Sequence, residues 1–425
     1  MVERQRMDTA VQDDLDRLRL PAEALEIVLA HTPRLSAERV SLVDAVGRIL
    51  AQDLTATEDF PSFRASTMDG FAVVAEDDSP WREVVGAQMA GALQELRVSV
   101  GTAVRIMTGA PVPEGATAVI PIEQAEAADD HIIVQAESLR AGDNIRGIGA
   151  DVRCGELVLH AGTVLGPAEI GLVAGLGEVP VPVRRRARVS VLSTGDELVE
   201  PDQPLRTGQI RDSNRFSLVA ALTGVGAEIV WAGTAPDDRE QLRHLFEDRI
   251  QESDIVVTSG GVSMGDLDLV KLLLSDLATV HFRRIKMKPG KPLNFATRGE
   301  TLIFGLPGNP VSALVSFEVF IRNALAQMNG QRVPVHPRVP VVLEQDIVPS
   351  DRIEYQRATV RVGENGKLVG STTGGQASSR LSSFVGANAL LEIPPRERPF
   401  RRGERVDALL LSVPQAAVEE ATSIS

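Results

Sequence analysis

The chain has 425 residues, too many for one hydrophobic core, and the usual domain size of roughly 100–200 residues predicts about three or four folding units. With 43% hydrophobic and 24% charged residues it has a globular composition, and its formal net charge of −14 argues against a general binder of nucleic acids or anionic membranes. No stretch resembles a signal peptide or has the length of a membrane span, so we expect a cytoplasmic protein.

The number of cysteines excludes an internal disulfide and a metal site built from several cysteines. Cys154 is the single cysteine, so there is no internal disulfide and no thiolate zinc site. We interpret it as a small, buried, apolar residue. The six histidines are scattered without the spacing of metal ligands, and we interpret them as structural or surface residues.

Two helices are predicted near the start of the chain. Residues 15–31 have helical spacing, with Pro21 suited to a first turn and with Leu25 and Val28 on one face. A second helix is expected over residues 42–51.

Strands are predicted for the next hundred residues. Residues 54–146 show alternation, for example at Val104 and Ile106, together with turn signals, and helical spacing is nearly absent. Residues 151–182 are interpreted as short strands and turns that rejoin the N-terminal helices in one elongated unit. The basic run at residues 184–186 is interpreted as the solvated face of a linker.

Strands and helices alternate between residues 187 and 332. The segments RVSVLSTG, AEIVWAGTA, DIVVTSGG and TLIFGLPGNP are predicted strands, the first and last ending in a turn, and each is followed by a segment with helical spacing. Such repeated units predict a mostly parallel sheet with helices on both faces, and ligands bind these sheets at the carboxyl ends of the strands. The polar loops at those ends are residues 193–197, 234–238, 259–268 and 306–312. Beyond residue 334, strand-like segments such as YQRATVRV and ALLEIP predict a small C-terminal barrel or sandwich.

The stretch IVVTSGGVSMG, residues 255–265, is the central motif of the chain. Its apolar, β-branched beginning predicts a strand buried on both faces, and it runs directly into Ser259, Gly260, Gly261 and Ser263 before a helix-like segment. Glycines let backbone N–H groups approach an oxyanion, and the start of a helix favours negative charge. We therefore predict a site for phosphate or another oxyanion, although glycines that merely turn the chain are the alternative.

Acidic pairs follow three successive strands: Asp196 and Glu197, Asp237 and Asp238, and Asp266 and Asp268. Each pair alone is explained by helix capping. Three acidic loops at one edge of a sheet, beside a phosphate loop, instead suit the hard oxygen ligands that Mg²⁺ prefers.

A basic segment, RRIKMKPGKP, lies at residues 283–292. Two prolines and a glycine stiffen the backbone that carries Lys288 and Lys291, which is unusual for charges that only aid solubility. Further polar turns occur in GLPGNPVSA, in STMDG and in RIMTGAPVP. Because a turn needs only Asp-Gly, Asp69 of STMDG also has a purely structural interpretation.

The motifs MDG, IMTGAPVPEGA, STGDEL, TSGGVSMGDLD, KPGKP and LPGNPVSA, in this order, resemble the MoeA-type molybdopterin molybdenumtransferases and the related C-terminal domain of gephyrin. The resemblance runs from Leu15 to Ser412. It implies four domains: an elongated N-terminal unit (15–53 and 147–185), a β-rich insertion domain (54–146), an α/β molybdopterin-binding domain with a mostly parallel sheet (186–332), and a C-terminal β-barrel (333–413). It also implies a homodimer that converts adenylylated molybdopterin and molybdate into molybdenum cofactor and AMP with Mg²⁺, the final step of cofactor assembly.

The resemblance also implies roles for particular residues. Catalytic positions are Asp69, Thr108, Glu197, Asp237, Asp268 and Lys288, with Glu197 and Asp268 as metal ligands. Positions that bind the pterin or the oxyanion are Asp151, Ser259, Gly260, Gly261, Ser263, Lys291, Pro307, Gly308, Asn309, Ser312, either Arg352 or Arg357, and Ser378. Molybdate is a dianion that needs Lys, Arg and hydroxyl donors, so we expect positioning and electrostatics rather than covalent catalysis.

Five positions depart from the family pattern: Arg64, Ala65, Phe71, Thr117 and Arg284. They leave open a divergent paralogue. Two further alternatives are a molybdopterin-binding scaffold that has lost the chemistry and the sister enzyme, molybdopterin adenylyltransferase. The retained acids argue against the scaffold, and the insertion and the C-terminal strands go beyond the smaller adenylyltransferase. Expected protein partners are molybdopterin adenylyltransferase and molybdoenzyme clients, with no nucleic acid and no membrane.

Overall fold

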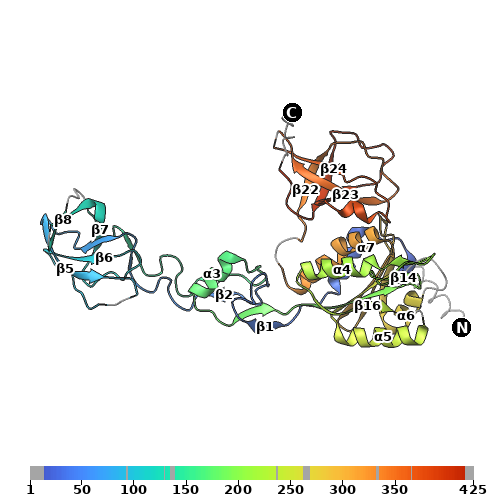
Figure 1. Ribbon diagram of the computed structural model, residues 1–425, viewed down its shortest axis with the longest axis horizontal. Helices are drawn as coiled ribbons and strands as arrows, with labels where there is room; N and C mark the ends of the chain where they lie inside the picture. The colour runs from blue at the N-terminus through green and yellow to red at the C-terminus, as the bar shows by residue number, and fades with distance from the viewer. Residues whose placement is uncertain are drawn as a thin grey trace. The chain divides into compact units, whose positions relative to one another are not determined.

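The computed structural model describes residues 14–91, 94–128, 130–134, 139–235, 238–261, 269–331, 335–364 and 366–416. The chain divides into two compact units (Figure 1). The first unit contains the residues up to Glu38, Gly47–Ala51 and the chain from Val183 onward. The second contains Arg39–Val46 and Gln52–Pro182, so it is inserted into the sequence of the first. No helix among the described residues is both long and apolar enough to cross a membrane.

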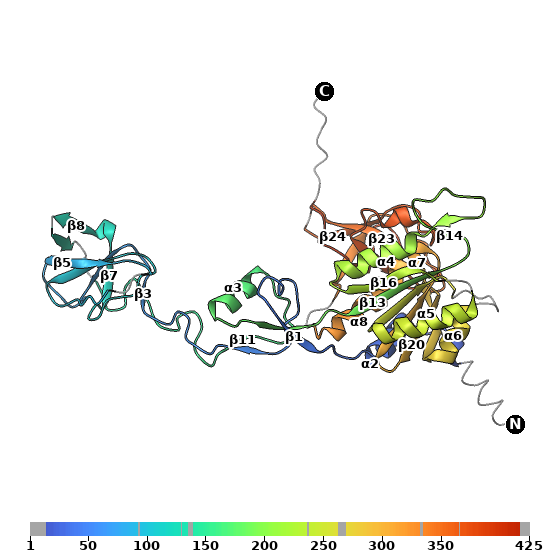
Figure 2. The ribbon, with the colours of Figure 1, turned by 60° about the horizontal axis from the view of Figure 1, so that its bottom comes forward.

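A six-stranded sheet forms the centre of the first unit (Figure 2). Its strands, in spatial order, are β16 (Glu228–Ala235), β13 (Arg188–Thr194), β17 (Ile255–Ser259), β21 (Thr301–Leu306), β20 (Pro292–Arg298) and β18 (Thr279–Arg284). The first four pair in parallel, whereas β20 is antiparallel to both of its neighbours. The predicted mostly parallel sheet is therefore confirmed, and β18 and β20 are additions to it.

Helices cover both faces of this sheet because the strand side chains alternate between two cores. Val189 and Val191 of β13 face a core shared with α4 (Ser213–Gly224) and α7 (Pro310–Ser316). Leu192 faces the opposite core, which is shared with α5 (Arg239–Glu252) and α6 (Leu269–Leu277). The first core also includes α2 (Pro21–Ala30) and α8 (Arg322–Met328), with a π-helical turn at Phe317–Ile321 between α7 and α8.

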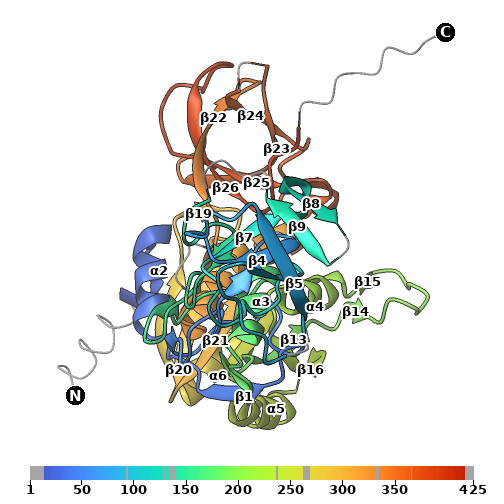
Figure 3. The same ribbon diagram turned by 90° about the vertical axis from the view of Figure 1, so that its left-hand side faces the viewer.

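The C-terminal strands close into a barrel, which can be followed in Figure 3. They are β22 (Arg338–Leu343), β23 (Ile353–Val362), β24 (Leu368–Thr372), β25 (Ala389–Ile393) and β26 (Arg405–Leu410). The spatial order is β23, β24, β22, β26, β25, and β25 pairs back with β23, so the ring has no free edge. A short strand from the α/β part of the chain, β19 (Met287–Lys288), pairs in parallel with β23 outside the ring.

The second unit contains its own six-stranded sheet. The spatial order is β7 (Ala118–Pro121), β4 (Gly70–Val73), β6 (Thr102–Ile106), β5 (Trp81–Gln88), β9 (His131–Val134) and β8 (Ala125–Ala128). At Gly70 the backbones of β4 and β7 approach so closely that a Cβ atom would lie 1.9 Å from the carbonyl oxygen of Ile120. The same unit contains the short sheets β2 (Leu54–Thr55) with β11 (Leu157–Leu159) and β3 (Ala65–Ser66) with β10 (Ile145–Arg146), and the helix α3 (Pro167–Gly175).

Two helix predictions in this region were wrong. Residues 42–47 form turns rather than a helix, because Gly47 takes a left-handed φ of 72° and Leu50 forms a β-bridge with Val183. Conversely, α3 lies in the segment predicted to contain only short strands and turns. Pro167 occupies its first turn, where a missing N–H is tolerated.

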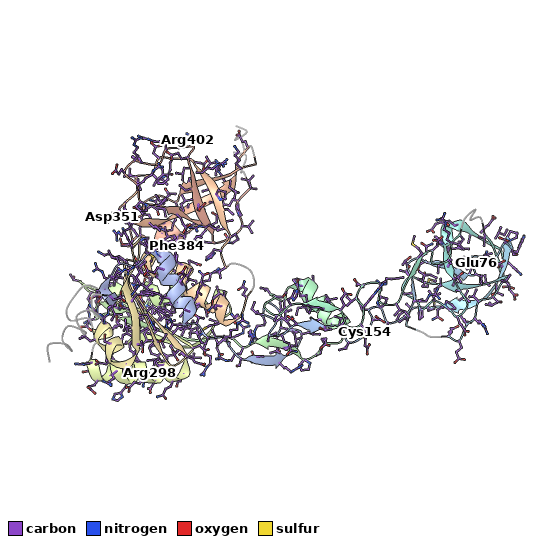
Figure 4. All side chains as sticks on the ribbon, turned by 180° about the vertical axis from the view of Figure 1, so that it is seen from behind. Glu76, Cys154, Arg298, Asp351, Phe384 and Arg402 are labelled. Carbon is purple, nitrogen blue, oxygen red and sulfur yellow. The ribbon has the colours of Figure 1, made fainter. Side chains whose placement is uncertain are left out.

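The interpretations of residues 184–186 and of Cys154 were also wrong. Arg184 donates to the carbonyl oxygens of Leu35 and Ala51, and Arg185 forms a two-pronged ion pair with Asp254 at 2.6 Å, so these residues tie segments of the first unit together. Cys154 is exposed, as Figure 4 shows, and its Sγ lies 3.3 Å from a carbonyl oxygen.

Candidate functional site

The carboxyl ends of β13 and β17 lie at the switch point of the first unit's sheet, where the topology predicts a ligand site. After β13 the chain crosses to β16 on one side, whereas after β17 it crosses to β18 at the far edge on the other side. In open α/β sheets a crevice forms where neighbouring connections leave in opposite directions, and ligands bind there.

Two glycines allow the turn after β17 to lie close against the end of β13. Gly260 has a φ of 91°, and a Cβ atom there would lie 2.5 Å from the carbonyl oxygen of Thr194. Gly261 has a φ of 61°, and its Cβ would lie 2.6 Å from the side chain of Val270 in α6. Packing of the chain itself therefore requires both glycines. The rest of this turn, with Ser263, Asp266 and Asp268, lies outside the described residues.

The turn after β21 packs against the turn after β17. The N–H of Gly260 donates to the carbonyl oxygen of Leu306 at 3.1 Å, and a Cβ atom on Gly308 would lie 3.7 Å from the Cα of Gly260. Pro307 is buried, whereas Gly308 and Asn309 are exposed. The backbone is therefore accessible to solvent at Gly308 and Asn309, and its polar groups there can contact a ligand.

A side chain that the motifs did not predict links these turns. Asn214, in the first turn of α4, donates from Nδ2 to the hydroxyl of Ser259 and to the carbonyl oxygen of Gly308, each at 2.7 Å. The available sequence signal was an amide placed two residues after Asp212, the N-cap of α4, which already accepts from the backbone N–H of Arg215 at 3.1 Å.

Several buried polar atoms cluster at this edge of the sheet. Four of the buried side-chain atoms that lack a hydrogen-bond partner in the described part of the chain lie here: Ser193 Oγ, Thr194 Oγ1, Thr258 Oγ1 and Asn214 Oδ1. Buried polar groups are nearly always paired in folded proteins, so these four atoms are groups with which a polar ligand at the strand ends could pair.

The acidic loop after β13 is held by Arg215. Its guanidinium donates to both carboxylate oxygens of Glu200, at 2.6 and 2.7 Å, and lies 3.2 Å from Asp212. Glu197 is exposed, and its carboxylate lies over Gly195, where a Cβ atom would lie 2.6 Å from both carboxylate oxygens, so the absence of a side chain at Gly195 leaves room for it. The loop is therefore anchored at Glu200, and Glu197 in the same loop is accessible to solvent.

The other acidic loops provide less evidence for a metal. Asp238 caps α5 by accepting from the N–H of Gln241 at 2.9 Å, which confirms the capping interpretation for that residue. Asp237 lies outside the described residues. Within the described ranges, no group of three or more His, Cys, Asp or Glu side chains is arranged to hold a metal ion. The exposed carboxylate of Glu197 is of the hard oxygen type that Mg²⁺ prefers, and its expected companion Asp268 lies in the part of the chain that is not described.

The basic segment meets the barrel at Lys288. Its ammonium, on a side chain that is 47% exposed, lies 3.1 Å from the buried carboxylate of Glu354, which is opposite Lys288 in the pairing of β19 with β23. Burial would raise the pKa of Glu354, but hydrogen bonds from Ser350, Gln356 and Lys288 hold it below its usual value. Lys288 is thus an oriented cation beside an ionised partner. Lys291 is partly buried, and its carbonyl oxygen accepts from the backbone at 2.8 Å.

The two candidate arginines differ in their surroundings. Arg352 is partly exposed and lies 3.2 Å from the carboxylate of Asp351. Arg357 is 1% exposed and donates to the hydroxyl of Ser383 at 3.0 Å and to the carbonyl oxygen of Ala377 at 3.3 Å. Burial lowers the pKa of Arg357 to about 10, against the opposing attraction of Glu354.

The loop that Arg357 holds also carries Ser378. The carbonyl oxygen of Ser378 accepts from the N–H of Val311 in the first turn of α7, at 3.1 Å, and Ser312 in that turn is buried. The structure therefore brings the barrel loop, the basic segment and the turn after β21 together within the first unit.

Asp69 and Thr108 belong to the second unit, where they form a pair. One carboxylate oxygen of Asp69 accepts from the backbone N–H of Thr108 at 2.7 Å and from its hydroxyl at 2.8 Å. These hydrogen bonds hold the pKa of Asp69 below its usual value. Both residues are exposed, as is Asp151 in the same unit.

The five departures from the family pattern have varied surroundings. Phe71 and Ala65 are buried, and the hydroxyl of Thr117 accepts a backbone N–H at 2.8 Å. Arg64 donates to a carbonyl oxygen at 3.2 Å, and Arg284 is partly buried. The four departures in the second unit are not sequence neighbours of Thr108. Arg284 lies four residues before Lys288 in the basic segment.

Fold and site together define a class: a multidomain α/β protein whose central domain has glycine turns and unpaired polar atoms at its strand ends and whose chain continues into a closed barrel. Residues 20–177 match the MoeA N-terminal region (domain I and II), residues 190–327 match a probable molybdopterin binding domain, and residues 341–411 match the MoeA C-terminal region (domain IV).

Known proteins resemble the chain over most of its length. The molybdopterin molybdenumtransferase of Haemophilus influenzae is 37% identical over 87% of this chain and 92% of its own. The crystal structure of the molybdopterin biosynthesis moeA protein from Pyrococcus horikoshii OT3 is 32% identical, with a TM-score of 0.78 over 93% of this chain and 100% of that one. Gephyrin of Dictyostelium discoideum is 36% identical over 92% of this chain, which spans 62% of that gephyrin.

The chain belongs to the family of MoeA-type molybdopterin molybdenumtransferases, transferases of molybdenum cofactor biosynthesis to which gephyrin is related. The family, the fold class and the enzyme activity predicted from the motifs are confirmed.

Proposed function

We propose that the enzyme inserts molybdate into adenylylated molybdopterin and releases AMP, and that Mg²⁺ takes part. The observation that carries this proposal is the contact between the glycine turns after β17 and β21, beside the acidic loop after β13. A pyrophosphate-bearing substrate needs backbone donors near a carboxylate that can hold a metal, and these loops follow neighbouring strands of one sheet.

In this proposal the substrate pyrophosphate lies over the turns formed by Ser259, Gly260, Gly261 and Gly308. Glu197, together with Asp268, holds the metal. Bound Mg²⁺ would neutralise negative charge on the phosphate oxygens. The exposed carboxylate of Glu197, on a loop fixed by Arg215, supports its part in this arrangement.

Molybdate would bind beside the basic segment, through Lys288, Lys291, Ser312 and Ser378. Of the two arginines we propose Arg357 as its partner. Arg352 already faces a carboxylate, whereas Arg357 is buried with hydrogen bonds to a neutral hydroxyl and a carbonyl oxygen. A dianion nearby would compensate the burial of that charge.

We further propose a homodimer in which the second unit of one subunit faces the first unit of its partner. Asp69 and Thr108 would then complete the partner's site. Their exposure and the fixed, ionised state of Asp69 support this role. Heterodimers of Asp69→Asn and Asp268→Asn chains should recover up to about half of the wild-type rate of AMP release, because two-fold symmetry leaves one site intact. Recovery no better than either parent would refute the shared site.

Molybdopterin adenylyltransferase and molybdoenzyme clients remain the expected protein partners, and the cytoplasm remains the expected compartment. Mixing the purified chain with a molybdopterin adenylyltransferase and measuring their association tests the first of these expectations.

The test of the reaction is AMP release from adenylylated molybdopterin, measured while molybdate and Mg²⁺ are varied. Lys288→Ala should raise the half-saturating molybdate concentration about tenfold, since loss of a charged donor removes roughly 1.5 kcal/mol or more. Lys286→Ala, an exposed lysine two residues earlier, is the matched control and should leave that concentration unchanged. AMP release that depends on neither molybdate nor Mg²⁺ in the wild type would contradict the proposal.

A further inference from the structure

Asn214 joins the two glycine turns of the site from the first turn of α4. Its Nδ2 donates to Ser259 Oγ at the end of β17 and to the carbonyl oxygen of Gly308 after β21, both at 2.7 Å. We propose that Asn214 is a positioning residue that sets the spacing of these turns for the phosphate groups of the substrate. This inference rests on the proposed function.

The position of Asn214 matters because the strand ladder ends beside it. Ser259 and Leu306 are the last partners in the pairing of β17 with β21. Beyond them the chains diverge into turns, joined by the bond from Gly260 N–H to Leu306 and then by the Asn214 amide. The amide therefore extends the connection between the two chains past the end of the sheet.

The chemistry of the two contacts requires an amide in this orientation. Both contacts use donors of Nδ2, and a flipped amide or a carboxylate would place an oxygen against the carbonyl oxygen of Gly308. Ser259 accepts from Asn214, so this bond does not use the hydroxyl hydrogen of Ser259. The hydroxyl hydrogen of Ser259 can therefore be donated to another acceptor. A phosphate oxygen of the substrate is such an acceptor.

A purely structural role for Asn214 predicts a different result from a positioning role. If Asn214 only attached α4 to the sheet, its loss would lower stability and leave substrate affinity unchanged in the folded protein. If it sets the spacing of the turns, affinity for the phosphate-bearing substrate falls, while the molybdate dependence, which belongs to the basic segment, stays the same.

The experiment compares Asn214→Asp with Asn323→Asp in the full chain. Asn323 donates from Nδ2 to the carbonyl oxygen of Val319 at 2.9 Å, so the control makes the same change of donor to acceptor away from the strand ends. Binding of adenylylated molybdopterin is measured by calorimetry without molybdate. We expect about tenfold weaker binding for Asn214→Asp, in line with leaving hydrogen-bonding groups unpaired, and wild-type binding for the control.

Turnover kinetics and two further variants complete the test. The half-saturating concentration of adenylylated molybdopterin should rise in Asn214→Asp, while that of molybdate stays at the wild-type value. If Asn214→Asp does not fold, Asn214→Ala should bind weakly and Asn214→Ser, which keeps one donor, should recover part of the affinity. Wild-type affinity in folded Asn214→Asp or Asn214→Ala overturns the inference. Failure of the wild type to bind the substrate overturns the proposed function and the inference with it.

Discussion

Replacing His281 by Gln should make the first unit less sensitive to acid. His281 lies on β18, with its ring centroid 3.8 Å from that of His31 and its Nε2 2.9 Å from the hydroxyl of Thr297. Burial, with a smaller contribution from the neighbouring His31, lowers the pKa of His281 to about 4. In the unfolded chain a histidine titrates near a pH of about 6.5, so between these values the unfolded state binds a proton that the folded state refuses.

The sign and size of the effect follow from these two pKa values. The contribution of His281 to the free energy of unfolding is fully present above a pH of about 6.5. It is lost progressively as the pH drops below that value, and the loss stops below a pH of about 4. At pH 5 this difference in pKa would lower the free energy of unfolding by roughly 2 kcal/mol if the ring were fully buried. Partial exposure of the ring reduces the loss to roughly 1 kcal/mol. His281→Gln should remove this acid-dependent loss.

The two tryptophans of the chain permit a measurement on one unit. Trp231 lies in β16 of the first unit and Trp81 in β5 of the second, so a Trp81→Phe background leaves fluorescence that reports on the first unit. Urea unfolding at pH 8 and pH 5 should show a smaller acid-dependent loss in His281→Gln. His244→Gln, at a site on α5 whose side chain is 74% exposed, is the control. An equal loss in His281→Gln and in its parent would refute the reasoning.

Three further changes test other parts of the structure. Gly70→Ala should destabilise the second unit by about 2–4 kcal/mol, because its Cβ atom would lie 1.9 Å from a backbone oxygen of β7; urea unfolding followed by Trp81 fluorescence measures this, and an unchanged midpoint would contradict it. Arg215→Met should release the loop held through Glu200 and raise the Mg²⁺ concentration needed for AMP release, an effect that Glu200→Gln should share in weaker form. Thr108→Val should raise the pKa of Asp69 toward its usual value by removing one hydrogen bond, and carboxyl carbon NMR titration would show an unmoved pKa if this is wrong.

The α/β part of the fold was predictable because its inner strands are continuous apolar runs. IVVTS of β17 is buried along its whole length, as a parallel strand between two helical layers must be. The antiparallel strands were not predictable in the same way. β18 reads TVHFRR, and an edge strand tolerates such charges because only one of its sides is paired. β20 begins at Pro292, which is the last residue of the basic segment, so the charged residues before it obscured the start of the strand.

The helix errors arose from glycines. Residues 42–51 have apolar spacing typical of a helix, but a left-handed Gly47 interrupts the segment. In α3 the opposite happened, because Gly171 and Gly175 lower the helical propensity of a segment that Pro167 and Glu169 start well. The carboxylate of Glu169 accepts from the N–H of Gly166 at 3.0 Å, which stabilises the start of α3.

The site was predictable where a short motif carries its own geometry. The Asp69–Thr108 contact joins two recognisable motifs, and the glycine turns lie at the strand ends where they were expected. Asn214 and Glu354 were not predictable, because each acts on a partner far away in sequence and neither has a local signal. The four domain limits and the roles of individual site residues stay predictions.

The insertion of the second unit into the sequence of the first sets an order of synthesis. Helix α2 packs against α8, where Gln327 donates to the carbonyl oxygen of Leu29 and Leu35 donates to that of Met328. About 290 residues separate the two helices, so at roughly 5–20 residues per second the ribosome needs about 15–60 s to supply the partner of α2. During that interval the second unit is completed, while the apolar face of α2, with Ala24 and Val28, has yet to meet its core. In a newly made chain this apolar face therefore lacks its packing partner until α8 has been synthesised.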